Sequence, residues 1–122
     1  MFEVSVESHF DAAHFLRAYH GKCENLHGHR YTVMVSLKTG TLDKGGLAYD
    51  FEDLKKHLKS ILSEYDHHSL NDVPPFDKIN PSAENIATTI YDKLKPLLKG
   101  KIVISRIEVW ETPNNRITFY PE

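Results

Sequence analysis

The sequence is poor in three features that would each indicate a particular class of protein. It has one cysteine, Cys23, so no internal disulfide can form and the thiol must be core packing, a metal ligand or a reactive group. No apolar run approaches the roughly 18 residues needed to cross a bilayer, and the N-terminus lacks a charged leader with an apolar segment. The net charge of −2 gives no basic excess for nucleic acid. We therefore expect a cytoplasmic protein without a membrane or nucleic-acid partner.

Histidine, in contrast, is abundant, with eight copies in 122 residues. Its imidazole binds transition metals and exchanges protons near neutral pH. A chain of this length usually builds one hydrophobic core, and the sequence shows no repeat, low-complexity tract or linker. Residues 1–122 are therefore expected to form a single domain that carries the whole function.

The pattern of apolar residues predicts four strands and two helices. The predicted strands cover 2–14, 30–38, 102–111 and 117–120. Apolar residues at spacings of three, four and seven predict one helix after Asp50 and another after Ser82, each of which suits an N-cap. The order β-β-α-α-β-β predicts an α+β fold, a four-stranded antiparallel sheet with two helices on one face. Such a sheet has open edges, so we expect a homo-oligomer in which subunits close them.

A candidate metal site begins at His27 and His29, which share the parity of the apolar residues from Tyr31 onward. Side chains two residues apart on a strand lie on one face and can share a metal ion. The most suitable third ligand is His14, at the end of the strand expected to pair with this one. Three imidazoles favour zinc over calcium or magnesium and would leave an open catalytic position. The alternative is that the histidines are ordinary surface residues.

Three further groups carry possible chemistry. Cys23 lies in a polar loop, which favours a catalytic thiol over a core residue, although it could also be a fourth ligand of a closed zinc site. Asp66, His67 and His68 follow the first predicted helix, where the carboxylate could orient an imidazole or the histidines could instead cap the C-terminus of the helix. Glu111 ends an apolar strand face, where it could bind two adjacent N–H groups of an amino-pyrimidinone ring or pair with Arg106 or Arg116.

These motifs together resemble the 6-pyruvoyltetrahydropterin synthase and 6-carboxytetrahydropterin synthase family, which has the tunnelling fold. The resemblance spans nearly the whole chain and rests on Phe10-Asp11-Ala12-Ala13-His14, Cys23-x3-His27-Gly28-His29, Asp50-Phe51-x2-Leu54-Lys55, Asp66-His67-His68-x-Leu70-Asn71, Asn80-Pro81-Ser82-Ala83-Glu84-Asn85 and Glu111-Thr112. It implies Zn²⁺ held by His14, His27 and His29.

The same resemblance assigns the other roles. It implies Cys23 as the proton-abstracting base, Asp66 and His67 as a relay, and Glu111 as the anchor of the pterin ring. Glu84 is a candidate for a second pterin contact. The family's Asp-His relay reaches the cysteine from a neighbouring subunit, which implies a trimer or hexamer whose sheets join into a barrel with intersubunit active sites.

The spacing of three residues between Cys23 and His27 resembles the bacterial members of the queuosine pathway. The implied activity is that of a lyase, 6-carboxy-5,6,7,8-tetrahydropterin synthase. Its substrate is 7,8-dihydroneopterin triphosphate, and its products are 6-carboxytetrahydropterin, acetaldehyde and triphosphate. Lys22, Arg17 and Arg30 are candidates for the triphosphate contacts. The alternatives are a 6-pyruvoyltetrahydropterin synthase and a non-catalytic structural zinc module.

Overall fold

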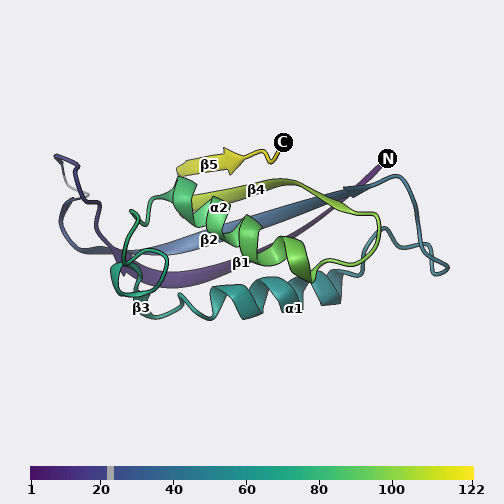
Figure 1. The fold of residues 1–122 in the computed structure, drawn as a ribbon, viewed down its shortest axis with the longest axis horizontal. Helices are drawn as coiled ribbons and strands as arrows, with labels where there is room; N and C mark the ends of the chain where they lie inside the picture. The colour runs from purple at the N-terminus through teal and green to yellow at the C-terminus, as the bar shows by residue number, and fades with distance from the viewer. Residues whose placement is uncertain (22–23) are drawn as a thin grey trace.

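The computed structural model describes residues 1–21 and 24–122, which form one sheet and two α-helices (Figure 1). The strands and helices are β1 (Phe2–His14), β2 (His27–Thr39), α1 (Phe51–Leu62), β3 (His68–Ser69), α2 (Ala83–Leu94), β4 (Val103–Thr112) and β5 (Asn115–Phe119). Short 3₁₀ helices, Leu70–Asp72 and Lys95–Leu97, follow β3 and α2. None of the helices in the described residues is long and apolar enough to cross a membrane.

The sheet has five strands in the order β3-β1-β2-β4-β5 and not the four that the sequence predicts. β1 and β2 are the long central pair, antiparallel from Phe2 opposite Thr39 to His14 opposite His27. The additional strand, β3, has only two residues and runs parallel to β1, with Ala12 opposite His68. A two-residue strand is too short to show an alternating pattern, and β3 could therefore not be predicted from periodicity.

Both helices cover the same face of the sheet (Figure 1). α1 packs against β1, whereas α2 packs against β4 and β5. Each begins at the predicted N-cap, because the side chain of Asp50 accepts from Glu52 N–H and that of Ser82 from Asn85 N–H. α1 ends at Leu62, and a turn then carries Tyr65 into the core.

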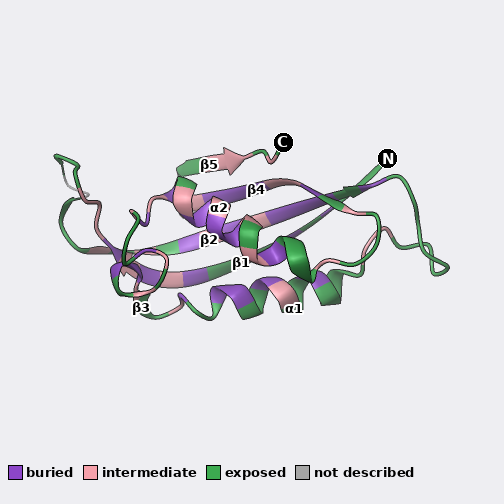
Figure 2. Ribbon diagram, viewed as in Figure 1, coloured by how far each residue is buried: buried purple, intermediate pink, exposed green. Residues whose placement is uncertain are grey.

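The hydrophobic core lies between this face and the helices, where Figure 2 shows the buried segments. Its centre includes Phe10 of β1 stacked on Tyr31 of β2, with ring centroids 4.8 Å apart. The two residues are register partners, so their rings meet on the same face. The packed core around Phe10 and Tyr31 thus supports the end of the sheet where His14 and His27 lie.

A β-bulge in β4 changes which residues face the core. Ser36 is opposite Arg106, yet Leu37 is opposite Ile104, so Ser105 is an extra residue on β4. The bulge reverses the alternation before it, and Ile104 is 7% exposed whereas Val103 is 64% exposed. Val103 has the same parity along the strand as Ile107 and Val109, yet only the latter two are buried in the core.

Candidate functional site

Three imidazoles meet at one end of the core face. His14 ends β1 and lies opposite His27 at the start of β2, and Ala12 lies opposite His29. All three side chains extend from the face that carries Phe10 and Tyr31, because each shares the parity of the buried residues on its strand. His14 is completely buried, and its ring centroid lies 4.6 Å from that of His27 and 5.2 Å from that of His29.

Hydrogen bonds to backbone carbonyls fix two of these rings. Nδ1 of His14 is 2.8 Å from the carbonyl oxygen of Pro81, and Nδ1 of His27 is 2.6 Å from that of Asn25. A carbonyl oxygen only accepts, so each Nδ1 carries the hydrogen and each Nε2 of a neutral ring presents a lone pair. These two Nε2 atoms lie only 3.1 Å apart. Two facing lone pairs at this distance repel unless a proton or a metal ion lies between them.

Glu111 joins the same cluster from β4. Its Oε1 lies 3.4 Å from Nε2 of His14 and 3.6 Å from Nε2 of His29. The register between β4 and β5 passes from Trp110 to Thr112 and skips Glu111, which is how a bulge redirects a side chain. The ligand atoms of all four residues lie within 4.8 Å of one another, so the group could hold a metal ion. Among the described residues, Glu111 forms ion pairs with His14 and His29. Arg106 and Arg116 pair with Glu108 instead.

The charges in the cluster influence one another. The close contact with Nε2 of His14 is the main factor that lowers the pKa of Glu111, with the nearby imidazoles adding to it against the opposing effect of burial. Burial lowers the pKa of His29, which favours its neutral ring. A neutral imidazole beside an ionised carboxylate is the protonation state that a divalent metal ion requires of its ligands.

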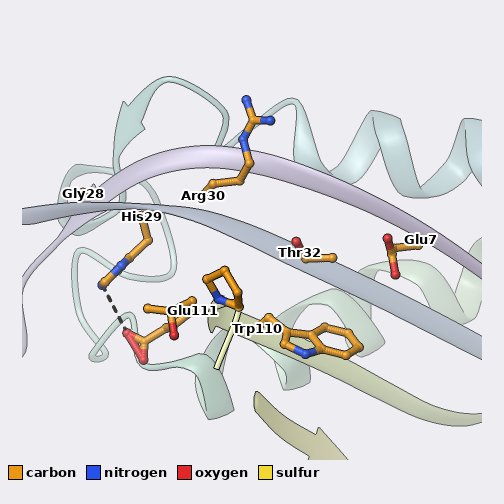
Figure 3. A pocket seen from close by; sticks show the side chains of 9 residues that line it. Glu7, Gly28, His29, Arg30, Thr32, Trp110 and Glu111 are labelled. Atoms are coloured by element: carbon orange, nitrogen blue, oxygen red, sulfur yellow. Dashed lines mark ion pairs between the residues drawn. The ribbon is translucent and has the colours of Figure 1, made fainter. Parts of the chain in front are cut away.

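A cleft of about 590 Å³ adjoins the cluster, lined by His29, Glu111, Trp110 and Thr112 among others (Figure 3). In Figure 3, His29 and Glu111 point toward each other at one end of this cleft, and Trp110 lies farther along it. The volume is within the range of small-molecule sites. A ligand in this cleft could therefore reach the carboxylate and the imidazoles together.

A second cluster lies at the outer edge of β1. Nδ1 of His67 is 3.0 Å from Oδ2 of Asp66, so the two residues form the carboxylate-imidazole pair that the sequence suggested. Oδ1 of Asp66 accepts from the backbone N–H of Asp11, the main factor that lowers the pKa of Asp66. His67 has a φ of 61°, a left-handed conformation that a non-glycine residue adopts only when its surroundings hold it.

The remaining candidates are distributed around these clusters. Glu84 is exposed in the first turn of α2, two residues after the N-cap Ser82. The guanidinium of Arg17 donates to the carbonyls of Ile79 and Phe76 and that of Arg30 to the carboxylate of Asp11, so protein atoms already engage both proposed triphosphate contacts. Cys23 and Lys22 lie outside the described residues.

Sequence reasoning missed several groups that support the site. The carbonyls of Pro81 and Asn25 orient His14 and His27, but a backbone carbonyl leaves no signature in a sequence. Asp11 contacts Asp66 across 55 residues of chain, which no local pattern indicates. A signal was present, however, because Asp11 and Arg30 are opposite charges on the solvent-facing sides of two strands predicted to pair.

Comparisons with known proteins find related chains and a similar fold. A family model described as 6-pyruvoyl tetrahydropterin synthase matches residues 3–122. A relative from Haemophilus influenzae named 6-carboxy-5,6,7,8-tetrahydropterin synthase is 36% identical, covering 94% of this chain and 96% of its own. A Bacillus subtilis relative of the same name is 34% identical over 99% and 86%. The solved 6-pyruvoyl tetrahydropterin synthase of Caenorhabditis elegans is 31% identical with a TM-score of 0.84, covering 100% of this chain and 98% of its own.

Proposed function

The chain belongs to the 6-pyruvoyl tetrahydropterin synthase family, and from that premise we propose that it is a zinc-dependent 6-carboxy-5,6,7,8-tetrahydropterin synthase. It converts 7,8-dihydroneopterin triphosphate to 6-carboxytetrahydropterin, acetaldehyde and triphosphate, and it serves 7-deazapurine (queuosine) synthesis in the cytoplasm. Support comes from two bacterial relatives that carry this name and match this chain over most of its length. The observation that carries the proposal is the pair of Nε2 atoms, on His14 and His27, facing each other at 3.1 Å.

The donor set fits a zinc ion. Two atoms that bind one zinc ion at about 2.0–2.1 Å with tetrahedral angles are separated by about 3.3 Å. The observed separations are 3.1 Å between His14 and His27, 3.4 Å between His14 and Glu111, and 3.6 Å between His29 and Glu111. The carbonyl contacts of His14 and His27 are those that usually orient metal-bound imidazoles. We therefore assign zinc to His14, His27 and His29.

Zinc bound at these residues supplies a Lewis acid that polarises the side-chain oxygens of the substrate. The protein supplies the proton transfer. Cys23 precedes His27 by four residues, and its thiolate is the base that removes hydrogen from the substrate side chain. His67 assists this thiol, while Asp66 holds the imidazole at Nδ1 and leaves Nε2 for the reaction. Asp66 is thus a positioning residue for His67.

Glu111 has two roles, and its carboxylate cannot perform both at once. Its carboxylate anchors the amino-pyrimidinone edge of the pterin through two parallel N–H bonds. In the structure, the same carboxylate lies against His14 and His29 and belongs to a four-residue donor set. Substrate binding would then require the Glu111 carboxylate to turn from the histidines to the pterin ring. Glu84, exposed at the start of α2, is the candidate for a second contact to the ring.

The catalytic assembly is proposed to be a homo-oligomer, a trimer or hexamer with active sites between subunits. The support is that β5 ends the sheet on one side and the two-residue β3 covers only a small part of β1 on the other. Light scattering measures the assembly size. Mixing Cys23→Ala protein with His67→Ala protein tests the shared site, because each hybrid interface with both intact residues regains activity. Two inactive variants that stay inactive after subunit exchange would contradict it.

Product analysis tests the reaction itself. Zinc-loaded protein is incubated with 7,8-dihydroneopterin triphosphate, and acetaldehyde and the pterin product are identified by mass spectrometry. Acetaldehyde together with 6-carboxytetrahydropterin is the expected result. A pterin that retains its three-carbon side chain would instead establish a 6-pyruvoyltetrahydropterin synthase.

A structural zinc module is the other alternative, and Cys23→Ala distinguishes it from an enzyme. We expect the variant to lose turnover while its zinc content and thermal stability remain those of the wild type. If Cys23 were a structural ligand, zinc and folded structure would be lost together.

A further inference from the structure

Asp11 and Arg30 form an ion pair beside the Asp66–His67 dyad. The proposed reaction gives Asp11 no role, and it gives Arg30 only that of a triphosphate contact, although its guanidinium is already bound to Asp11. We propose that Asp11 and Arg30 are positioning residues that keep the Asp66 carboxylate on His67. This inference rests on the proposed function only in treating the dyad as part of the catalytic machinery. Its evidence is the hydrogen bonding and charge arrangement at the edge of β1.

The backbone of Asp11 holds the dyad at two points. Its N–H donates to Oδ1 of Asp66 at 2.9 Å, and its carbonyl accepts from the backbone N–H of His67 at 2.6 Å. The same stretch of β1 continues into the short parallel pairing with β3. His67 has a left-handed backbone conformation, which is unfavourable for a residue with a side chain. The contacts with Asp11 hold His67 in this conformation.

The side chain of Asp11 places a second carboxylate in the same cluster. Its ligand oxygen, that of Asp66 and a ring nitrogen of His67 all lie within 4.8 Å of one another. Two carboxylates this close repel, and the repulsion would displace one of them or favour its protonation. Asp11 therefore needs a cation of its own.

Arg30 supplies that cation from the neighbouring strand. It lies directly opposite Asp11 in the β1–β2 register, and in Figure 3 its side chain leaves β2 on the opposite side from His29. Nε donates to Oδ1 of Asp11 at 2.9 Å and an Nη donates to Oδ2 at 3.0 Å, a bidentate pair. This bond lowers the pKa of Asp11 and raises that of Arg30, and the charge of Asp66 also acts on Arg30.

The pair is too exposed to be explained by stability. The side chain of Arg30 is 63% exposed and that of Asp11 39%, and solvent weakens such ion pairs. Lys59 and His9 line a cleft that Asp66 also lines, but within residues 1–21 and 24–122 no ion pair joins either of them to Asp66. As long as the Arg30 guanidinium is bound to Asp11, the Asp66 carboxylate remains paired with His67.

This arrangement makes the two charges interdependent. Without the Asp11 carboxylate, the guanidinium of Arg30 is free to take Asp66 away from His67. Without Arg30, the carboxylates of Asp11 and Asp66 face each other uncompensated. Removal of both charges leaves Asp66 with His67 as its nearest charged partner, and the backbone of residue 11 still donates to it. A double variant should therefore regain what either single variant loses.

The kinetic test compares Asp11→Asn, Arg30→Met and the double variant, all loaded with zinc and assayed with 7,8-dihydroneopterin triphosphate. Each single variant should lose about tenfold in kcat with KM within about twofold of the wild type, as for other residues that orient a catalytic group. The double variant should return to within about threefold of the wild type. Lys55→Met is the control, because Lys55 forms an exposed pair with Glu52 at 4.0 Å on α1 and neither residue belongs to either cluster.

A second measurement does not depend on activity. Amide hydrogen exchange, corrected for intrinsic rates, reports the N–H of residue 11 that Asp66 accepts and the N–H of His67. Exchange at residue 11 should be faster in both single variants and near the wild-type rate in the double variant. Single variants that behave like Lys55→Met in both measurements would overturn the proposal, and so would a double variant as impaired as the worse single variant. If the wild type does not turn over this substrate, the proposed function fails, and the exchange data alone decide the role of the pair.

Discussion

Removal of His27 should abolish the effect of zinc on stability while leaving the zinc-free protein intact. His27 is only partly buried at the start of β2, so His27→Ala opens no core cavity. It also removes one of the two Nε2 atoms that face each other at 3.1 Å without a metal ion. The zinc-free variant should therefore be as stable as the zinc-free wild type or slightly more stable, within about 1 kcal/mol.

The magnitude of the zinc effect follows from the number of ligands. Structural zinc sites with four ligands bind with about 10–16 kcal/mol, so one ligand contributes about 2.5–4 kcal/mol, or roughly 10²–10³-fold in affinity. Zinc at about 100 times the wild-type Kd stabilises the folded state by about 2.7 kcal/mol. At about 4 °C per kcal/mol for a chain of this size, the wild-type Tm rises by roughly 11 °C.

The same zinc concentration is only about 0.1–1 times the Kd of His27→Ala. The stabilisation then falls below about 0.5 kcal/mol, and the Tm rise should be less than roughly 2 °C. Scanning calorimetry with and without zinc measures both values, and competition with a chromophoric chelator gives the Kd. His20→Ala is the control, because its side chain is fully exposed and lies outside the cluster. A His27→Ala variant that kept the full zinc shift would refute the assignment of the three histidines.

Three further outcomes test the fold and the second cluster. Phe10→Ala should cost about 3–5 kcal/mol in urea unfolding of the zinc-free protein, because the ring is 1% exposed and stacks on Tyr31; a loss under about 1 kcal/mol would contradict this core. Asp50→Ala should cost about 1 kcal/mol by removing the acceptor for Glu52 N–H at the start of α1, with no effect on zinc affinity. Because the pKa of Asp66 is lowered from 3.8 in the folded state, its contribution is present above that pH and lost as the pH falls through the depressed value. Unfolding free energies measured in this acid range should therefore decline less in Asp66→Asn, and identical curves would remove that role.

Local periodicity was sufficient for most of the fold. Alternation placed the long strands, helical spacing placed α1 and α2, and Asp50 and Ser82 marked where the helices begin. It failed where a feature is not periodic. The bulge at Ser105 reverses the faces of Val103 and Ile104, and β3 is too short to alternate.

The geometry of the histidines was readable for the same reason. His27 and His29 share a face because they are two residues apart on one strand, and His14 meets them if the two strands pair as a hairpin usually does. Glu111 was assigned to the correct face of β4, but its approach to the imidazoles was not foreseen. That approach depends on the bulge between Trp110 and Thr112, which involves the register of β5.

The sequence by itself determined which residues alternate, which faces are apolar and which side chains can bind a metal ion, because these properties depend on neighbours within a few residues. The tertiary structure alone decided that carbonyls of Pro81 and Asn25 turn two imidazoles toward each other, and that Asp11 joins Arg30 to the Asp66–His67 dyad. Such contacts depend on strand register and on the path of the chain after α1, and these are set by packing of the whole domain.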